Sequence, residues 1–188
     1  FKGVTATMHL KEGHEIYFSP RPAAKVPYGI KADVDKALDK VYENGIPIDG
    51  RGLLVASQVV PIVKIKDGEK SVCLCTNYKS TINDHLMDEH YDFPTVNEQI
   101  EKLKGEFHSC VDITGAYNQV AVTPGFSQEL LTMVTSRGYV MPTRLPFGVK
   151  TAPKIFQAGM DKLIHGMDGK STIPNLSLIH ISEPTRRH

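Results

Sequence analysis

Apolar residues recur with helical spacing in two parts of the chain. Between Lys31 and Asn44 they fall on one side of a helix, at Val34, Ala37, Leu38, Val41 and Tyr42. This spacing predicts an amphipathic helix, and Gly45 follows it at the position of a left-handed cap. A second helix is expected to open at Thr151 with Pro153 in its first turn. Its broad apolar face would consist of Ile155, Phe156, Met160, Leu163 and Ile164.

The remaining apolar runs are shorter and favour strands. Residues 59–75 form two runs around Asp67-Gly68, which predicts a β-hairpin that carries Lys64, Lys66 and Lys70. Four more strands are expected at 107–112, 118–122, 130–135 and 138–141. A short helix is expected over 93–105, where Thr95 and Glu98 have capping-box spacing. Residues 1–30 have proline and glycine separators and are expected to be extended. This mixed order predicts an α+β fold.

Composition narrows the class of protein. The chain has 188 residues, 40% hydrophobic and 23% charged, with a net charge of +1 that gives no overall attraction to nucleic acid. No apolar run approaches the length of a membrane span, and no signal or transit peptide is recognised. Three cysteines, Cys73, Cys75 and Cys110, argue against a secreted disulfide scaffold. Phe1 in place of an initiating Met suggests a piece of something longer.

Two groups of residues are candidates for metal chemistry. Asp112 ends an apolar run in "VDITGAYNQV", where it either terminates a strand or serves as a metal ligand that needs further carboxylates. Cys73, Cys75, His85 and His90 have zinc-binding side chains. Only Leu74 separates the two cysteines, which is closer than structural zinc pairs usually are. In a strand these cysteines would share one face and pack as small hydrophobes. No phosphate-binding glycine loop, hydrolase elbow or dinucleotide fingerprint is present.

Five stretches in order carry a resemblance to a known family: "SQVVPIVKIKDG", "CLCTNYKSTIN", "FPTVNEQIEKLKG", "VDITGAYNQV" and "TSRGYVMPTRLPFGVKTAPKIFQAGMDKLIHGM". Over about 1–169 the chain resembles the reverse transcriptase domain of gypsy-type long-terminal-repeat retrotransposons, within the Pol polyprotein. The resemblance implies the right-hand polymerase fold. Residues 1–106 would be the lead-in and fingers and residues 107–175 a partial palm, which stops before the second catalytic motif.

The resemblance also implies roles for particular residues. Asp112 would be catalytic and would bind two Mg²⁺ ions, with Mn²⁺ as a substitute, and the backbone carbonyl of Ile113 would complete the ligand set. Paired metals stabilise the charge that develops on the attacking and leaving oxygens. Tyr117 would be the steric gate that favours deoxynucleotides. The other residues expected at the nucleotide are Lys64, Lys66, Gly115, Ala116, Phe147 and Gly148.

Two positions depart from the family pattern. Cys73 stands where an arginine normally grips the incoming triphosphate, and a thiol cannot replace that planar, charged fork. Asn77 stands in place of the aspartate of the usual Asp-Tyr-Arg or Asp-Tyr-Lys. Both departures are typical of a decaying copy of an element.

The family's other two metal ligands are adjacent aspartates, expected shortly after residue 169. That region contains no Asp, and "LSLIHISEPTR" at 176–186 resembles the translation of a common transposase-type sequencing adapter, so 176–188 are excluded from fold reasoning.

Two functions therefore stay open: a fragment of an RNA-directed DNA polymerase, or a catalytically dead or co-opted module that binds nucleic acid. The expected partners are an RNA or DNA template with its primer, dNTPs, and the thumb, connection, RNase H and integrase domains of the same polyprotein; no membrane partner is expected. The expected location is the cytoplasm, in a retrotransposon particle, or the nucleus.

Overall fold

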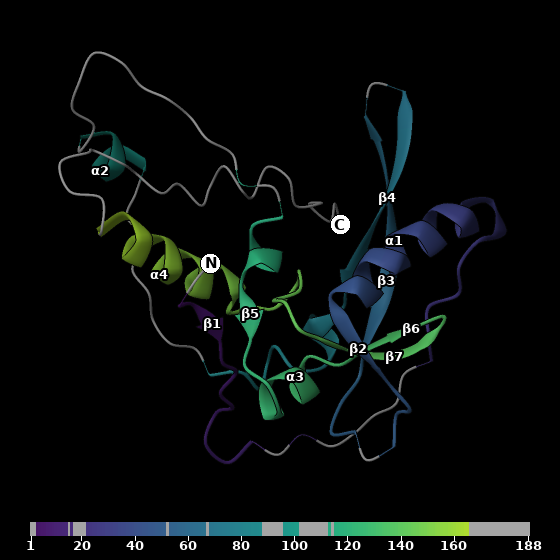
Figure 1. Ribbon diagram of the computed structural model, residues 1–188, viewed down its shortest axis with the longest axis horizontal. Helices are drawn as coiled ribbons and strands as arrows, with labels where there is room; N and C mark the ends of the chain where they lie inside the picture. Colours follow the sequence, from purple (N-terminus) through teal and green to yellow (C-terminus); the bar gives the residue numbers. More distant parts are fainter. Residues whose placement is uncertain are drawn as a thin grey trace.

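The computed structural model describes residues 3–14, 16, 22–51, 53–66, 68–87, 96–101, 113 and 115–165. The fold is a mixture of helices and strands with a mixed sheet, which confirms the α+β prediction (Figure 1). The expected strand at 107–112 lies outside the described residues. Within the described residues no helix is long and apolar enough to cross a membrane.

A five-stranded sheet carries the long hairpin. Its order is β2 (Gly45–Ile48), β7 (Gly138–Pro142), β6 (Met133–Thr135), β3 (Ser57–Lys66) and β4 (Glu69–Thr76). The predicted hairpin is confirmed as β3 and β4, which pair from Val59↔Thr76 to Lys66↔Glu69. β3 also pairs in parallel with β6, but only at Ser57 and Gln58. Beyond this point β3 has one strand neighbour among the described strands, so Pro61 removes no second set of ladder bonds.

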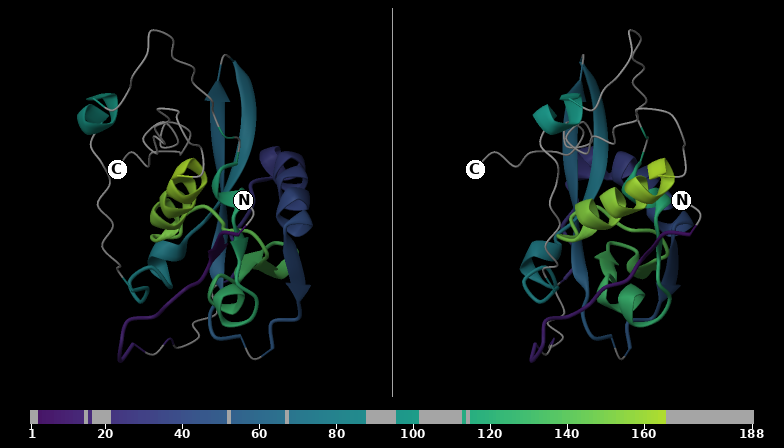
Figure 2. Two further views of the ribbon diagram at one scale, coloured as in Figure 1. Left: turned by 60° about the vertical axis from the view of Figure 1, so that its left-hand side comes forward. Right: turned by 90° about the vertical axis from the view of Figure 1, so that its left-hand side faces the viewer.

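The predicted helix at 31–44 is confirmed as α1 (Lys31–Glu43), whose Val34 and Leu38 are buried. It packs against β4 and β2 on one side of the sheet (Figure 2). Burial of two such side chains contributes about 1.5–3 kcal/mol each. Arg137, in the turn between β6 and β7, donates to the Asp39 carboxylate at 2.6 Å and to the Asp35 carbonyl at 2.9 Å. The helix is thereby held to the sheet on its polar side as well.

The left-handed cap expected at Gly45 is wrong. Gly45 is the first residue of β2 and is not among the described glycines with positive φ. A Cβ at this position would collide with the Val140 side chain and lie 3.0 Å from the Val41 carbonyl oxygen. Glycine is therefore needed because helix and strand approach closely, and not because the backbone turns left-handed.

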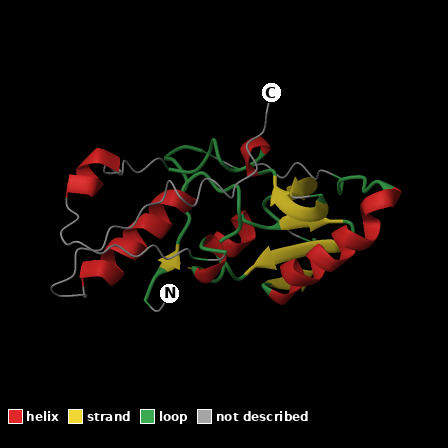
Figure 3. Cartoon of the chain, turned by 90° about the horizontal axis from the view of Figure 1, so that it is seen from above, coloured by secondary structure: helices red, strands yellow, loops and turns green. Residues whose placement is uncertain are grey.

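A further group of elements lies beside the five-stranded sheet (Figure 1 and Figure 3). β1 (Thr5–Ala6) pairs in parallel with β5 (Ala121–Val122), and α4 (Ala152–His165) confirms the predicted final helix. The core between these elements contains fully buried large side chains: Tyr78, Tyr117, Phe156, Ile82, Leu86, Leu130, Leu131 and Leu145.

Several predicted boundaries were wrong. In the strand expected at 118–122 only Ala121 and Val122 are extended, because a 3-10 turn (Tyr117–Gln119) precedes them. The strand expected at 130–135 begins only at Met133, since α3 (Phe126–Leu130) occupies the residues before it. The strand expected at 138–141 is confirmed as β7. Of the short helix expected over 93–105, α2 (Val96–Glu101) is described.

Among the described residues of the first thirty there is no α-helix, as predicted, and a 3-10 turn (Tyr28–Ile30) lies directly before α1. A second 3-10 turn (Tyr78–Ser80) follows β4.

Candidate functional site

A cavity of about 1170 Å³ lies between α1, the β3–β4 hairpin and the loop at 144–148. Six cationic side chains line it: Lys36, Lys40, Lys64, Lys70, Lys79 and Arg144. Two carboxylates of α1, Asp33 and Glu43, also line the cavity. The excess of cations makes this cavity a site of local positive charge in a chain whose net charge is only +1.

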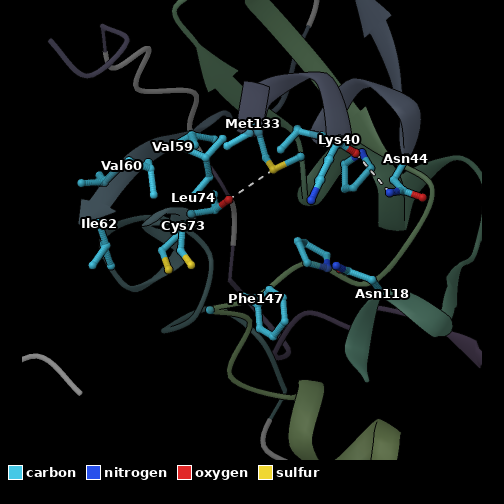
Figure 4. A pocket seen from close by; sticks show the side chains of 18 of the residues that line it. Lys40, Asn44, Val59, Val60, Ile62, Cys73, Leu74, Asn118, Met133 and Phe147 are labelled. Carbon is cyan, nitrogen blue, oxygen red and sulfur yellow. Dashed lines mark hydrogen bonds between the residues drawn. The ribbon is translucent and has the colours of Figure 1, made fainter. Parts of the chain in front are cut away.

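The cavity also has an apolar part. Figure 4 shows Phe147 and Asn118 on one side, Cys73 and Leu74 on the hairpin side, and Lys40 pointing from α1 into the space between them. Met133 of β6 lies at the back, where its sulfur accepts a hydrogen bond from the Thr76 hydroxyl at 3.2 Å. A cavity that is lined by an aromatic side chain and by several cations can hold a ligand that has a flat apolar part and an anionic part.

The loop that presents Phe147 is tightly fixed. Gly148 has φ +95°, and a Cβ there would lie 2.6 Å from the carbonyl oxygen of Thr76, at the end of β4. Asn83 donates to the Gly148 carbonyl at 2.9 Å and accepts from the Lys150 N–H at 3.0 Å. The loop therefore rests against the hairpin on one side and is held by a single amide side chain on the other.

Tyr78 supports the same region from within the core. Its ring is completely buried, and its hydroxyl donates to the Leu131 carbonyl at 2.8 Å. Burial raises the pKa of Tyr78 far above its ordinary value, and the neighbouring Thr76 hydroxyl has a weaker opposing effect. This tyrosine is therefore a neutral structural residue at any ordinary pH.

The predicted nucleotide residues fall into two groups. Lys64, Phe147 and Gly148 line the cavity, and so do the departing residues Cys73 and Asn77. Gly115, Ala116 and Tyr117 are described, but they do not line it. The ring of Tyr117 is buried, with edge contacts to Phe147 at 5.5 Å and Phe156 at 5.8 Å between ring centroids. Tyr117 thus lies behind Phe147, in the core.

The predicted metal site lies mostly outside the described residues. Asp112 is not described, nor is the side chain of Lys66. Ile113 is half-buried and packs against the core. Where the chain is described, no three or more His, Cys, Asp or Glu side chains are grouped so that they could hold a metal ion.

The cysteines and histidines that were considered as zinc ligands have different neighbours in the structure. Cys73 and Cys75 are half-buried thiols two residues apart in β4, and both line the cavity. The ring of His85 contacts His14 instead. His90 lies outside the described residues.

Of the six cations that line the cavity, only Lys64 was predicted from the sequence as a site residue. Lys36 and Lys40 come from α1, and Arg144 precedes the Pro-Phe-Gly step. The signal available for α1 was the spacing of four residues between the two lysines, which puts both on one helix face. The motifs of the family gave no reason to bring α1 to the site.

Comparison with known proteins places the chain among retroelement proteins, although no protein-family model matches it. It is 35% identical over 149 residues to an uncharacterised protein of Caenorhabditis elegans. It is 29% identical over 142 residues to the retrovirus-related Pol polyprotein from transposon 412 of Drosophila melanogaster. It is 23% identical over 170 residues to that from transposon gypsy of the same fly.

These similarities cover 78%, 74% and 89% of the chain, but only 11%, 11% and 16% of the respective relatives. The chain therefore spans a small segment of the proteins that it resembles. This similarity extends over most of the chain and identifies it as a relative of retrotransposon Pol polyproteins.

Proposed function

We propose that the chain is part of an RNA-directed DNA polymerase, the reverse transcriptase of a retrotransposon, in a right-hand polymerase fold. The observation that supports this most directly is the meeting of Lys64, Phe147 and Gly148 in one basic cavity. These residues come from two sequence motifs more than eighty positions apart. Its Pol polyprotein relatives supply the second support.

In this proposal the cavity binds an incoming dNTP beside a primer and its RNA or DNA template. The cations from α1 and the hairpin would attract phosphate groups, and the exposed part of Phe147 would lie against a base or sugar. Tyr117 would act through Phe147, since its own ring is buried behind that residue. Its steric-gate role would then depend on the position that it gives to Phe147.

Asp112, with the carbonyl of Ile113, would hold the Mg²⁺ ions. Bound metal would stabilise the negative charge of the transferring phosphoryl group. The described residues of this chain would bind and orient the nucleotide, exclude water from its base and fix the loop around Phe147. Asp112 cannot hold two ions alone, so further carboxylates from the polyprotein are needed.

Primer extension tests the proposal. The protein to use is the in-frame genomic continuation of residues 1–175, with Asp112→Asn as the matched control. We expect magnesium-dependent extension of a DNA primer on an RNA template, lost in the control because the metal ligand is gone. The 188-residue chain itself is expected to give no extension. Extension by this chain would contradict the statement that Asp112 needs further carboxylates to hold the two metal ions.

A second function is favoured by one observation. Cys73 and Asn77 line the cavity where the family has a guanidinium and a carboxylate, which suggests a module that binds nucleic acid without catalysis. Binding would then rest on lysine contacts with phosphates and would weaken steeply with salt. Titration of primer-template at two ionic strengths, together with the extension assay, separates the two functions: the non-catalytic module binds but does not extend, even in the longer protein.

A further inference from the structure

His14 and His85 form an imidazole pair, and neither residue lines the basic cavity. Their Nδ1 atoms lie 3.2 Å apart, and the ring centroids are separated by 5.3 Å with the planes at 78°. The two residues are 71 positions apart in sequence. A pair of nitrogen atoms this close is held there by the fold and not by chain proximity.

The backbone around the pair is well connected. Leu10 forms an antiparallel bridge with Leu86, and the Lys11 N–H donates to the His85 carbonyl at 2.9 Å. The His14 N–H donates to the Lys11 carbonyl at 3.2 Å, so the turn that carries His14 is closed on the same segment. Leu86 is buried in the core and anchors the other side. Both rings therefore stand on backbone that is already fixed.

The separation of the two nitrogens suits a metal ion. Two imidazole nitrogens, each about 2.05 Å from a tetrahedral Zn²⁺, lie about 3.3 Å apart. In the present arrangement one ring can donate a proton to the other, and a cation would replace that shared proton after a small rotation of the rings. His14 is exposed, and His85 is partly exposed, so an ion can reach them from solvent.

We propose that His14 and His85 form a two-histidine site for a divalent transition metal of the Zn²⁺ or Cu²⁺ class. The ion would cross-link the N-terminal segment at 9–14 to the segment at 82–87. It would thus close a loop that contains α1 and the whole β3–β4 hairpin, and so stabilise the region that bears the cavity. Its nitrogen ligands also differ from the oxygen ligands that the Mg²⁺ ions of the proposed polymerase need.

The residues around the His14–His85 pair determine how strongly we expect it to bind a metal ion. Where the chain is described, no third His, Cys, Asp or Glu completes a group with the pair, so water would fill the other coordination positions. The Lys11 ammonium donates to the carbonyl of Asp84, the residue before His85, at 2.8 Å, and its charge opposes a cation. We therefore expect weaker binding than in a four-ligand structural site, with Cu²⁺ preferred over Zn²⁺.

Metal titration of the purified chain tests the proposal, with ZnCl₂ and CuCl₂ followed by calorimetry and thermal unfolding. His14→Gln and His85→Gln should each remove one binding event and the metal-dependent rise in Tm. His9→Gln is the matched control, because His9 is exposed and lies in the same segment. The His9→Gln variant should keep both the binding event and the metal-dependent rise in Tm.

Other histidines of this chain can bind metal weakly, so a site-specific signal is needed. In ¹⁵N spectra of the imidazoles, Zn²⁺ should shift the Nδ1 resonances of His14 and His85 together. Loss of binding in the two variants together with this paired shift would support the site. The site is ruled out if binding and Tm are the same in all three variants, or if the two Nδ1 signals do not move with Zn²⁺.

Discussion

At the scale of single residues, Gly148 fixes where the Phe147 loop meets the hairpin. Its positive φ and its closeness to the Thr76 carbonyl are separate constraints, and a side chain would violate both. A left-handed backbone costs a non-glycine residue about 1–2 kcal/mol, and the clash with backbone adds to this because backbone cannot rotate away.

We predict that Gly148→Ala lowers the free energy of unfolding by about 3 kcal/mol or more. Gly115→Ala is the control, since Gly115 has φ +60° and a Cβ there would meet only the Asn118 side chain, at an ordinary 3.9 Å. It should lose only about 1–2 kcal/mol. Urea unfolding of both variants measures the difference, and equal losses would mean that the contact with Thr76 is unimportant.

Tyr78 gives a prediction about alkaline pH. Its pKa is raised in the folded state, so its contribution to stability is complete below the unfolded value of about 10 and is lost as the pH rises above it. Tyr78→Phe removes the hydrogen bond to Leu131 and should cost about 1 kcal/mol at pH 7. The phenylalanine cannot ionise when unfolded, so this difference should shrink to near zero around pH 11.

Denaturant unfolding at pH 7 and pH 11 measures this change. Tyr28→Phe serves as the control because that ring is 94% exposed, and it should change stability at neither pH. A stability difference between the Tyr78 variant and the original chain that is equal at both pH values would contradict the role of burial.

At the scale of elements, Asn83 connects the turn after β4 with the loop at 146–150. It uses both ends of its amide, as donor to Gly148 and as acceptor from Lys150. Two elements far apart in sequence are thus joined by one side chain. The cost of losing it depends on which of the two bonds is broken.

We predict that Asn83→Ala lowers stability by about 1–3 kcal/mol and speeds hydrogen exchange at the Lys150 amide. Asn83→Asp keeps the acceptor for that amide and loses only the donor to Gly148. Exchange at Lys150 should therefore stay slow in the aspartate variant. Equal exchange rates in the two variants would show that the Lys150 bond does not hold the loop.

Elements defined by their own sequence could be predicted. The stripe of Val34 and Leu38 specified α1, and the Asp67-Gly68 turn between apolar runs specified the hairpin, because both signals are local. α3 was missed because it has only five residues and starts with the exposed Phe126, so no periodicity could develop. The role of Gly45 was misread because its constraint, contact with Val140, comes from a strand almost a hundred residues later.

At the scale of the whole molecule, the cavity exists because three distant parts of the chain meet. α1 and the hairpin supply most of the cations, and the loop after β7 supplies Phe147. The family motifs predicted Lys64, Phe147 and Gly148, but the contribution of α1 depends on the parallel pairing of β3 with β6 and on the Arg137 contacts. These are long-range features, which no local pattern specifies.

The position of Cys73 allows the proposed function of this cavity to be strengthened by one substitution. Cys73 is half-buried in β4 and lies on the cavity wall with Lys40 across from it (Figure 4). Cys73→Arg would place a permanently charged fork there, and charge-assisted bonds to phosphate contribute about 1.5–3 kcal/mol each. We therefore predict that Cys73→Arg tightens binding of a dNTP by roughly tenfold to a hundredfold.

The matched control is Cys73→Gln, which has a long side chain without charge and fills a similar part of the cavity. Fluorescence titration with a labelled dNTP compares the three proteins, and a labelled nucleoside without phosphates tests whether the gain depends on the triphosphate. Higher salt should reduce the advantage of arginine, because the added contact is ionic. Glutamine and arginine variants with equal affinity, or a gain that persists for the nucleoside, would mean that the cations of this cavity do not face a triphosphate.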